Sequence, residues 1–136
     1  MGGTVLIVDP NDELRRRLGD LLEMHGFLVL EAADGITAWS VACNHKPDLI
    51  TVRDPAEVYG ARALLDSIRA NVAMEDLPVL ILERAGGHPE EWQERNAVVQ
   101  QLELGAGPDE YVRVVEGLLA PVGPDDPDTS STKLTM

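Results

Sequence analysis

Basic residues are scarce in this chain of 136 residues, which has 11 lysines and arginines against 24 aspartates and glutamates. The resulting net charge of −13 repels nucleic-acid phosphates and anionic lipid headgroups. We therefore expect neither nucleic acid nor a membrane surface among the direct partners. Only two lysines are present, Lys46 and Lys133, which leaves few candidates for any chemistry that needs an ammonium group.

Cysteine and long apolar runs are also sparse. Cys43 is the single cysteine, which excludes a disulfide within the chain and suits a reducing compartment. No apolar run reaches the length of a membrane span. The residues before the first predicted strand, Met1 to Gly3, lack the basic segment and cleavage site of a secretion signal. We therefore expect a cytoplasmic protein, with a length and hydrophobic content that suit one domain with its own core.

Short apolar runs and helical stripes alternate along the chain. Four runs bounded by turn-forming or helix-breaking residues predict buried strands: residues 4–8, 27–31, 49–52 and 78–82. Amphipathic spacing predicts helices in the segments that follow these runs: 11–25, 35–45, about 61–68, and 89–104. This alternation indicates βαβ units, and hence an α/β fold whose parallel sheet is covered on both faces.

The third predicted strand ends abruptly in a cluster of charge, Arg53-Asp54-Pro55. A buried strand cannot continue into such residues, so they should lie at its carboxyl end, where open α/β folds place their sites. Asp9 ends the first strand and Glu83 the fourth. The sequence therefore predicts that several charged side chains meet at this edge of the sheet.

The segment that begins at Pro108 allows two interpretations. Pro108-Asp109-Glu110 is a good helix start, and the apolar residues that follow keep helical spacing, which favours a helix over 108–119. The alternative is a fifth strand over 111–115, because too few residues remain before Pro121 for both a strand and a three-turn helix. From Pro121 onward there is almost nothing to bury. We therefore divide the chain into a folded domain at 1–120 and a disordered tail or linker at 121–136.

Five short segments follow one another along the chain in a characteristic order: Val5-Leu6-Ile7-Val8-Asp9, Ala33-Asp34-Gly35, Pro47-Asp48-Leu49-Ile50, Leu77-Pro78-Val79 and Leu102-Glu103-Leu104-Gly105-Ala106. Together, at these spacings, they make the chain resemble the receiver domain of two-component response regulators over about residues 4–119. The resemblance implies a three-layer, doubly wound, flavodoxin-like sheet of order 2-1-3-4-(5), with the fifth strand or the last helix shortened. Asp9 and Arg53 are then neighbours at the switch point between the first and third strands.

The resemblance also implies a chemistry that this chain lacks at most of the matching positions. The family phosphorylates an aspartate at the end of the third strand and holds Mg²⁺ with paired acids after the first. A hydroxyl residue after the fourth strand and a lysine after the fifth contact the phosphoryl group. Here Asp9 is retained, but Pro10 replaces the second acid, Arg53 the phosphorylated aspartate and Glu83 the hydroxyl residue, and the Lys-Pro segment is missing.

These departures predict a pseudo-receiver that is not an enzyme and needs neither cofactor nor Mg²⁺. A guanidinium cannot be phosphorylated as a carboxylate is, and it repels the metal. Arg53 can instead stand in for the metal as the cation that neutralises Asp9. We expect an Asp9–Arg53–Glu83 network that locks the domain in one state.

The leading functional interpretation is a phosphorylation-independent adaptor in bacterial signalling, which binds another protein or a second copy of itself. By resemblance, Trp92 and Tyr111 are the candidate interface residues. One alternative is a working receiver that uses Asp54 as phosphoacceptor, although a shift of one residue reverses the side-chain direction in a strand. The other is a flavodoxin-like binder of a small ligand, but no Gly-rich phosphate loop follows the first strand.

Overall fold

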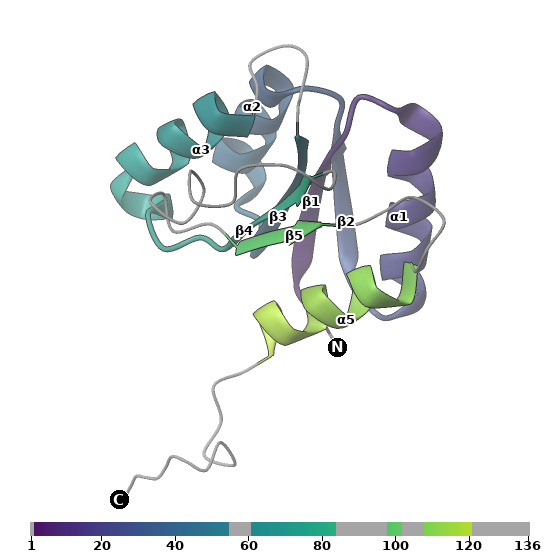
Figure 1. Ribbon diagram of the computed structural model, residues 1–136. Helices are drawn as coiled ribbons and strands as arrows, with labels where there is room; N and C mark the ends of the chain where they lie inside the picture. The colour runs from purple at the N-terminus through teal and green to yellow at the C-terminus, as the bar shows by residue number, and fades with distance from the viewer. Residues whose placement is uncertain (1, 55–60, 84–97, 102–107, 121–136) are drawn as a thin grey trace, which may run out of the picture.

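The computed structural model describes residues 2–54, 61–83, 98–101 and 108–120, with the backbone alone at 54, 61, 83, 98–101 and 108. Five parallel strands form one sheet in the order β2-β1-β3-β4-β5 (Figure 1). Their bounds are β1 Thr4–Val8, β2 Leu28–Ala32, β3 Leu49–Asp54, β4 Val79–Glu83 and β5 Val98–Gln101. The predicted doubly wound α/β fold and its strand order are confirmed.

Helices cover both faces of the sheet (Figure 1). On one face lie α1 (Asp12–Met24) and α5 (Pro108–Leu119), which contact each other. On the other face lie α2 (Gly35–His45) and α3 (Ala61–Ala70), and α3 is followed by the short 3-10 helix η1 (Val72–Met74). None of the helices in the described part of the chain is both long and apolar enough to cross a membrane.

The two faces bury separate core clusters, because side chains alternate along each strand. In β1, Val5 and Ile7 pack with residues of α1 and α5, whereas Leu6 and Val8 pack with residues of α2 and α3. Both sets are at most 1% exposed. Burial on both sides explains why residues 5–8 of this strand are apolar at every position rather than at alternate ones.

The helix ends follow the capping residues in the sequence. Asn11 caps α1 by accepting a hydrogen bond from the Leu14 N–H, and Asp34 caps α2 by accepting one from the Thr37 N–H. After α1 the chain turns at Gly26, whose φ of 92° lies in the region that glycine favours.

The helix predicted over 89–104 is wrong at residues 98–101, which form β5. Val98 and Val99 are β-branched, and they pair in register with Leu80 and Ile81 of β4. Pairing with an otherwise open sheet edge therefore overrides the local helical spacing. The remainder of that predicted helix lies outside the described residues.

The helix predicted over 108–119 is confirmed as α5, and the alternative strand over 111–115 is not formed. The chain has room for both a fifth strand and a full-length last helix, because β5 lies before Pro108 and not between Pro108 and Pro121 as the alternative assumed. The last helix is therefore not shortened, and β5, with four residues, is short. The predicted tail at 121–136 lies outside the described residues.

The prediction that Tyr111 lies at an interface is wrong. Its side chain is 0% exposed and packs with Val5, Ile7 and Leu80 in the core cluster beneath α1 and α5. Helical spacing placed Tyr111 on the apolar stripe of α5, and that stripe faces the sheet. The other predicted interface residue, Trp92, lies outside the described residues.

Candidate functional site: the Asp9–Arg53 pair

The ends of β1 and β3 bring two opposite charges together. The register pairs Val8 with Val52, so Asp9 and Arg53 follow as the next neighbours across the two strands. The Nε of Arg53 donates to Oδ2 of Asp9 at 2.5 Å, and the Asp9 side chain is only 1% exposed. The Asn11 N–H donates to the other carboxylate oxygen at 2.9 Å. Both oxygens of this buried carboxylate are therefore engaged within the protein.

The main chain of Asp9 is held as firmly as its side chain. Its N–H donates to the carbonyl oxygen of Ala32 at 3.1 Å, which ties it to β2. Its own carbonyl oxygen accepts a hydrogen bond from Nη1 of Arg15 at 2.7 Å. Asp9 is thus fixed by contacts to β2, β3 and α1, which leaves it little freedom to turn toward another ligand.

Arg15 forms a second charge network at the edge of this site. Its Nε donates to Glu31 at 2.9 Å and its Nη2 to Asp12 at 2.8 Å. Burial lowers the pKa of the Arg15 guanidinium, but the hydrogen bonds that it donates to Glu31 and Asp12, together with the charges of these carboxylates, outweigh this effect and hold the pKa above its ordinary value. Arg15 therefore stays charged and holds the Asp9 carbonyl in place.

Arg53 is left with one unsatisfied nitrogen. Its side chain is 17% exposed, yet Nη2 is buried and has no hydrogen-bond partner among the described residues. A buried N–H without an acceptor costs about 1–3 kcal/mol. The strand register pairs Arg53 with Leu82 and places Glu83 beside Asp54. Glu83, the third member of the predicted network, therefore lies one register position beyond the residue that pairs with Arg53. The structure describes the backbone of Glu83 but not its side chain.

A buried hydroxyl pair lies on the same face of β3, two residues before Arg53. The Thr51 hydroxyl is 3.0 Å from the Tyr111 hydroxyl of α5, and both side chains are 0% exposed. Burial raises the pKa of Tyr111; the Thr51 hydrogen bond and the charge of Arg53 act in the opposite direction. Tyr111 therefore remains a neutral phenol that links α5 to the third strand. No local sequence signal marks this contact, because the two partners are 60 residues apart.

Comparisons with known proteins agree with this architecture, although no family model matches the chain. The phosphate regulon transcriptional regulatory protein PhoB of Pseudomonas aeruginosa is 29% identical over 134 residues, which cover 93% of this chain. The chain spans 56% of the length of that relative. A putative response regulator from Chloroflexus aurantiacus is 25% identical, with a TM-score of 0.75 over 89% of this chain and 100% of its own.

A third comparison extends the likeness of fold. The chemotaxis protein CheY4 of Vibrio cholerae is 24% identical and superimposes with a TM-score of 0.76, over 88% of this chain and 100% of its own. The chain has the fold of response regulator receiver domains and is similar to them in sequence.

The described residues of this receiver-like domain do not suit Mg²⁺. That cation needs several oxygen ligands in near-octahedral geometry. After β1 the receiver offers the single carboxylate of Asp9, since Pro10 is an exposed residue without a ligand atom in its side chain. Both Asp9 oxygens are already bonded, one of them to a guanidinium whose charge opposes a metal ion. No group of three or more metal-ligating side chains occurs in the described part of the chain.

Proposed function

We propose that this receiver domain is a pseudo-receiver, a module of two-component signalling that works without phosphorylation. The observation that carries the proposal is the ion pair between Nε of Arg53 and Oδ2 of Asp9 at 2.5 Å. Arg53 stands at the carboxyl end of β3, where the family resemblance implies a phosphorylated aspartate. A guanidinium has no carboxylate oxygen with which to attack a phosphoryl group.

The same cation explains how the domain dispenses with a metal. In the receiver family that this chain resembles, Mg²⁺ neutralises the acids after the first strand. Here the guanidinium of Arg53 neutralises Asp9. The guanidinium is covalently part of the chain and stays charged at every physiological pH. The domain is therefore held in one electrostatic state, independent of ions or phosphoryl donors.

Glu83 is the proposed third member of this lock. Nη2 of Arg53 is buried and needs an acceptor, and Glu83 ends the neighbouring strand one register position beyond Leu82. A carboxylate accepting from this nitrogen would satisfy the guanidinium from a second strand. If Glu83→Gln and Glu83→Ala both unfold at the same urea concentration as the unchanged chain, Glu83 has no part in the lock.

The function that remains for such a domain is recognition of a protein, either another chain or a second copy. It is not an enzyme and carries no cofactor in this account. Trp92 is the remaining candidate anchor at that interface, since aromatic side chains often dominate protein–protein contacts. Substituting alanine for Trp92 should weaken partner binding and leave the thermal stability of the domain unchanged.

The test is incubation with a small phosphodonor and Mg²⁺, followed by intact-mass measurement, with a phosphorylatable receiver domain treated in parallel. We expect no gain of a phosphoryl group in this chain under conditions that modify the control. A gain that disappears in the Asp54→Asn variant would establish the alternative in which Asp54 is the phosphoacceptor. A gain that persists in that variant would place the modification elsewhere and would equally contradict a phosphorylation-independent domain.

A further inference from the structure

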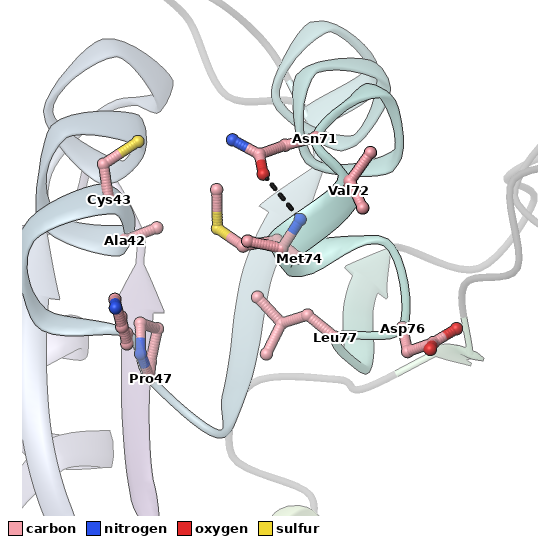
Figure 2. A pocket seen from close by; sticks show the side chains of 10 residues that line it. Ala42, Cys43, Pro47, Asn71, Val72, Met74, Asp76 and Leu77 are labelled. Carbon is pink, nitrogen blue, oxygen red and sulfur yellow. Dashed lines mark hydrogen bonds between the residues drawn. The ribbon is translucent and has the colours of Figure 1, made fainter.

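A separate pocket lies at the opposite edge of the sheet from Asp9 and Arg53, where β3 and β4 begin. Its cavity volume is about 340 Å³, which falls in the range of protein binding pockets. The last turns of α2, Pro47 ahead of β3, and the segment from Asn71 to Leu77 surround it (Figure 2). The pocket therefore shares no residue with the Asp9–Arg53 site.

The floor of the pocket is apolar and continuous with the core. Ala42 is 0% exposed, Pro47 is buried, and Met74 and Leu77 are partly buried against the core cluster beneath α2 and α3. Figure 2 shows the Met74 and Leu77 side chains pointing across the pocket toward α2 and Pro47. An apolar group that enters the pocket would therefore be removed from water on several sides.

Hydrogen bonds hold the wall between α3 and β4 in shape. Nη1 of Arg69 donates to the carbonyl oxygens of Glu75 and Leu77, at 3.0 and 2.7 Å. The side-chain oxygen of Asn71 accepts from the Ala73 N–H at 2.9 Å (Figure 2). This wall is thus built before anything binds, which reduces the ordering cost of an occupant.

The rim combines an exposed apolar residue with two opposite charges. Val72 is 84% exposed, and Lys46 and Asp76 line the pocket from opposite walls and are both exposed. The Asn71 amide nitrogen points across the opening toward α2 (Figure 2). The opening therefore offers hydrogen-bond donors from Asn71 and Lys46 around an apolar floor, and the Asp76 carboxylate points outward from the rim (Figure 2).

These features distinguish between three possible occupants. A small molecule that fills the cavity covers only the part of Val72 that lines it, whereas a protein segment laid across the rim can also cover the outer part of this 84% exposed side chain. A second copy brings another charge of −13 to a chain of the same charge, which opposes association. A basic partner meets no such repulsion, and the exposed residues Glu75 and Asp76 add negative charge at the outer rim, although Asp76 also interacts with the charge of Arg69.

We propose that this pocket docks a segment of a partner protein that inserts one apolar side chain and sets a lysine or arginine against Asp76. Main-chain carbonyls of the segment accept hydrogen bonds from Asn71 and Lys46. The proposal rests on the proposed function as an interaction module, and it specifies the chemistry of the partner. It does not depend on the Arg53 lock, so the phosphodonor experiment and the experiment below can fail separately.

The test uses short peptides with one leucine flanked by lysines, titrated into the full chain and followed by amide NMR shifts. We expect saturable amide shifts confined to residues 42–46 and 71–77, lost when the leucine becomes alanine or the lysines become glutamates. Ala73→Phe fills the pocket from an exposed position and should weaken binding at least tenfold. Ala70→Phe, an equally exposed change outside the pocket lining, should bind as the unchanged chain does.

Cys43 provides a second measurement without any substitution. It is exposed on the rim and is the only cysteine, so alkylation of the chain reports on this site alone. The leucine–lysine peptide should slow the reaction several-fold, and the glutamate peptide should not. Absence of saturable shifts, equal binding by Ala73→Phe, or equal protection by all peptides would overturn the proposal. Concentration-dependent shifts at these residues without peptide would overturn it in favour of a second copy.

Discussion

Replacing Asp9 with alanine tests whether the charge pair holds the domain together. The substitution removes a carboxylate that is 1% exposed and that accepts from Arg53 and from the Asn11 N–H. It leaves the Arg53 guanidinium, itself 17% exposed, without its ion-pair partner. Breaking a buried pair from one side costs on the order of 3–5 kcal/mol. Because Arg53 keeps some contact with water, we expect the lower end, about 3 kcal/mol.

The assay is urea unfolding followed by circular dichroism, supported by thermal unfolding. A loss of about 3 kcal/mol should lower the urea midpoint at an unchanged slope and reduce the melting temperature by on the order of 10 °C. The matched control is Glu13→Ala, which breaks the ion pair with Arg17 on α1. Those two side chains are 75% and 73% exposed, so we expect no measurable change.

A double-mutant cycle isolates the interaction free energy between Asp9 and Arg53 from the other effects of each substitution. Arg53→Met leaves the Asp9 carboxylate buried with the Asn11 N–H as its remaining donor among the described residues, so it should also destabilise the domain. The double variant Asp9→Ala/Arg53→Met should cost clearly less than the sum of the single changes, because neither charge is then left alone. An unchanged midpoint in Asp9→Ala, or strict additivity in the double variant, would refute the reasoning.

Three further predictions concern residues outside the charge pair. Thr51→Val should lower the free energy of unfolding in urea by about 1–3 kcal/mol, because it leaves the buried Tyr111 hydroxyl without its partner. Adding Tyr111→Phe should recover part of this loss. A Thr51→Val variant as stable as the unchanged chain would contradict the contact. Gly26→Ala should cost about 1 kcal/mol, since φ is 92° there, and a neutral result would mean that the turn adopts another conformation. The Thr37 N–H lowers the pKa of Asp34 below 3.8, so its stabilising effect is present above that pH and is lost as the pH falls through the lower folded value. The difference between the unchanged chain and Asp34→Ala should therefore shrink in acid, and a difference constant down to pH 2 would speak against this cap.

Patterns among residues close together in the sequence were sufficient to predict most of the fold. Residues 5–8 are apolar at every position, and residues 49–52 at every position except Thr51, because both runs are buried on both faces of the sheet. The side chains of Asn11 and Asp34 cap helices by accepting hydrogen bonds from N–H groups three residues later. Both partners of each bond are therefore close together in the sequence. The charge pair was also predictable, since strand order alone makes Asp9 and Arg53 neighbours.

Long-range contacts account for what the sequence did not show. β5 is four residues long, and its Val98-Val99-Gln100-Gln101 run fits a helical stripe as well as a strand until β4 provides a partner. The prediction for Tyr111 identified the correct helix but assigned the residue to the surface, because spacing along a helix does not say which structure its apolar stripe meets. The unsatisfied Nη2 of Arg53 depends on packing from several elements and has no sequence signature.

The central claim is that a guanidinium already occupies the place of a cation beside Asp9. A titration with Mn²⁺, an oxygen-preferring ion that broadens nearby NMR signals, tests this most directly. The amide signals of Val8, Asp9, Asn11 and residues 51–54 should keep their intensity relative to the rest of the domain. Selective loss of those signals at submillimolar Mn²⁺ would show a metal beside Asp9 and would contradict the account.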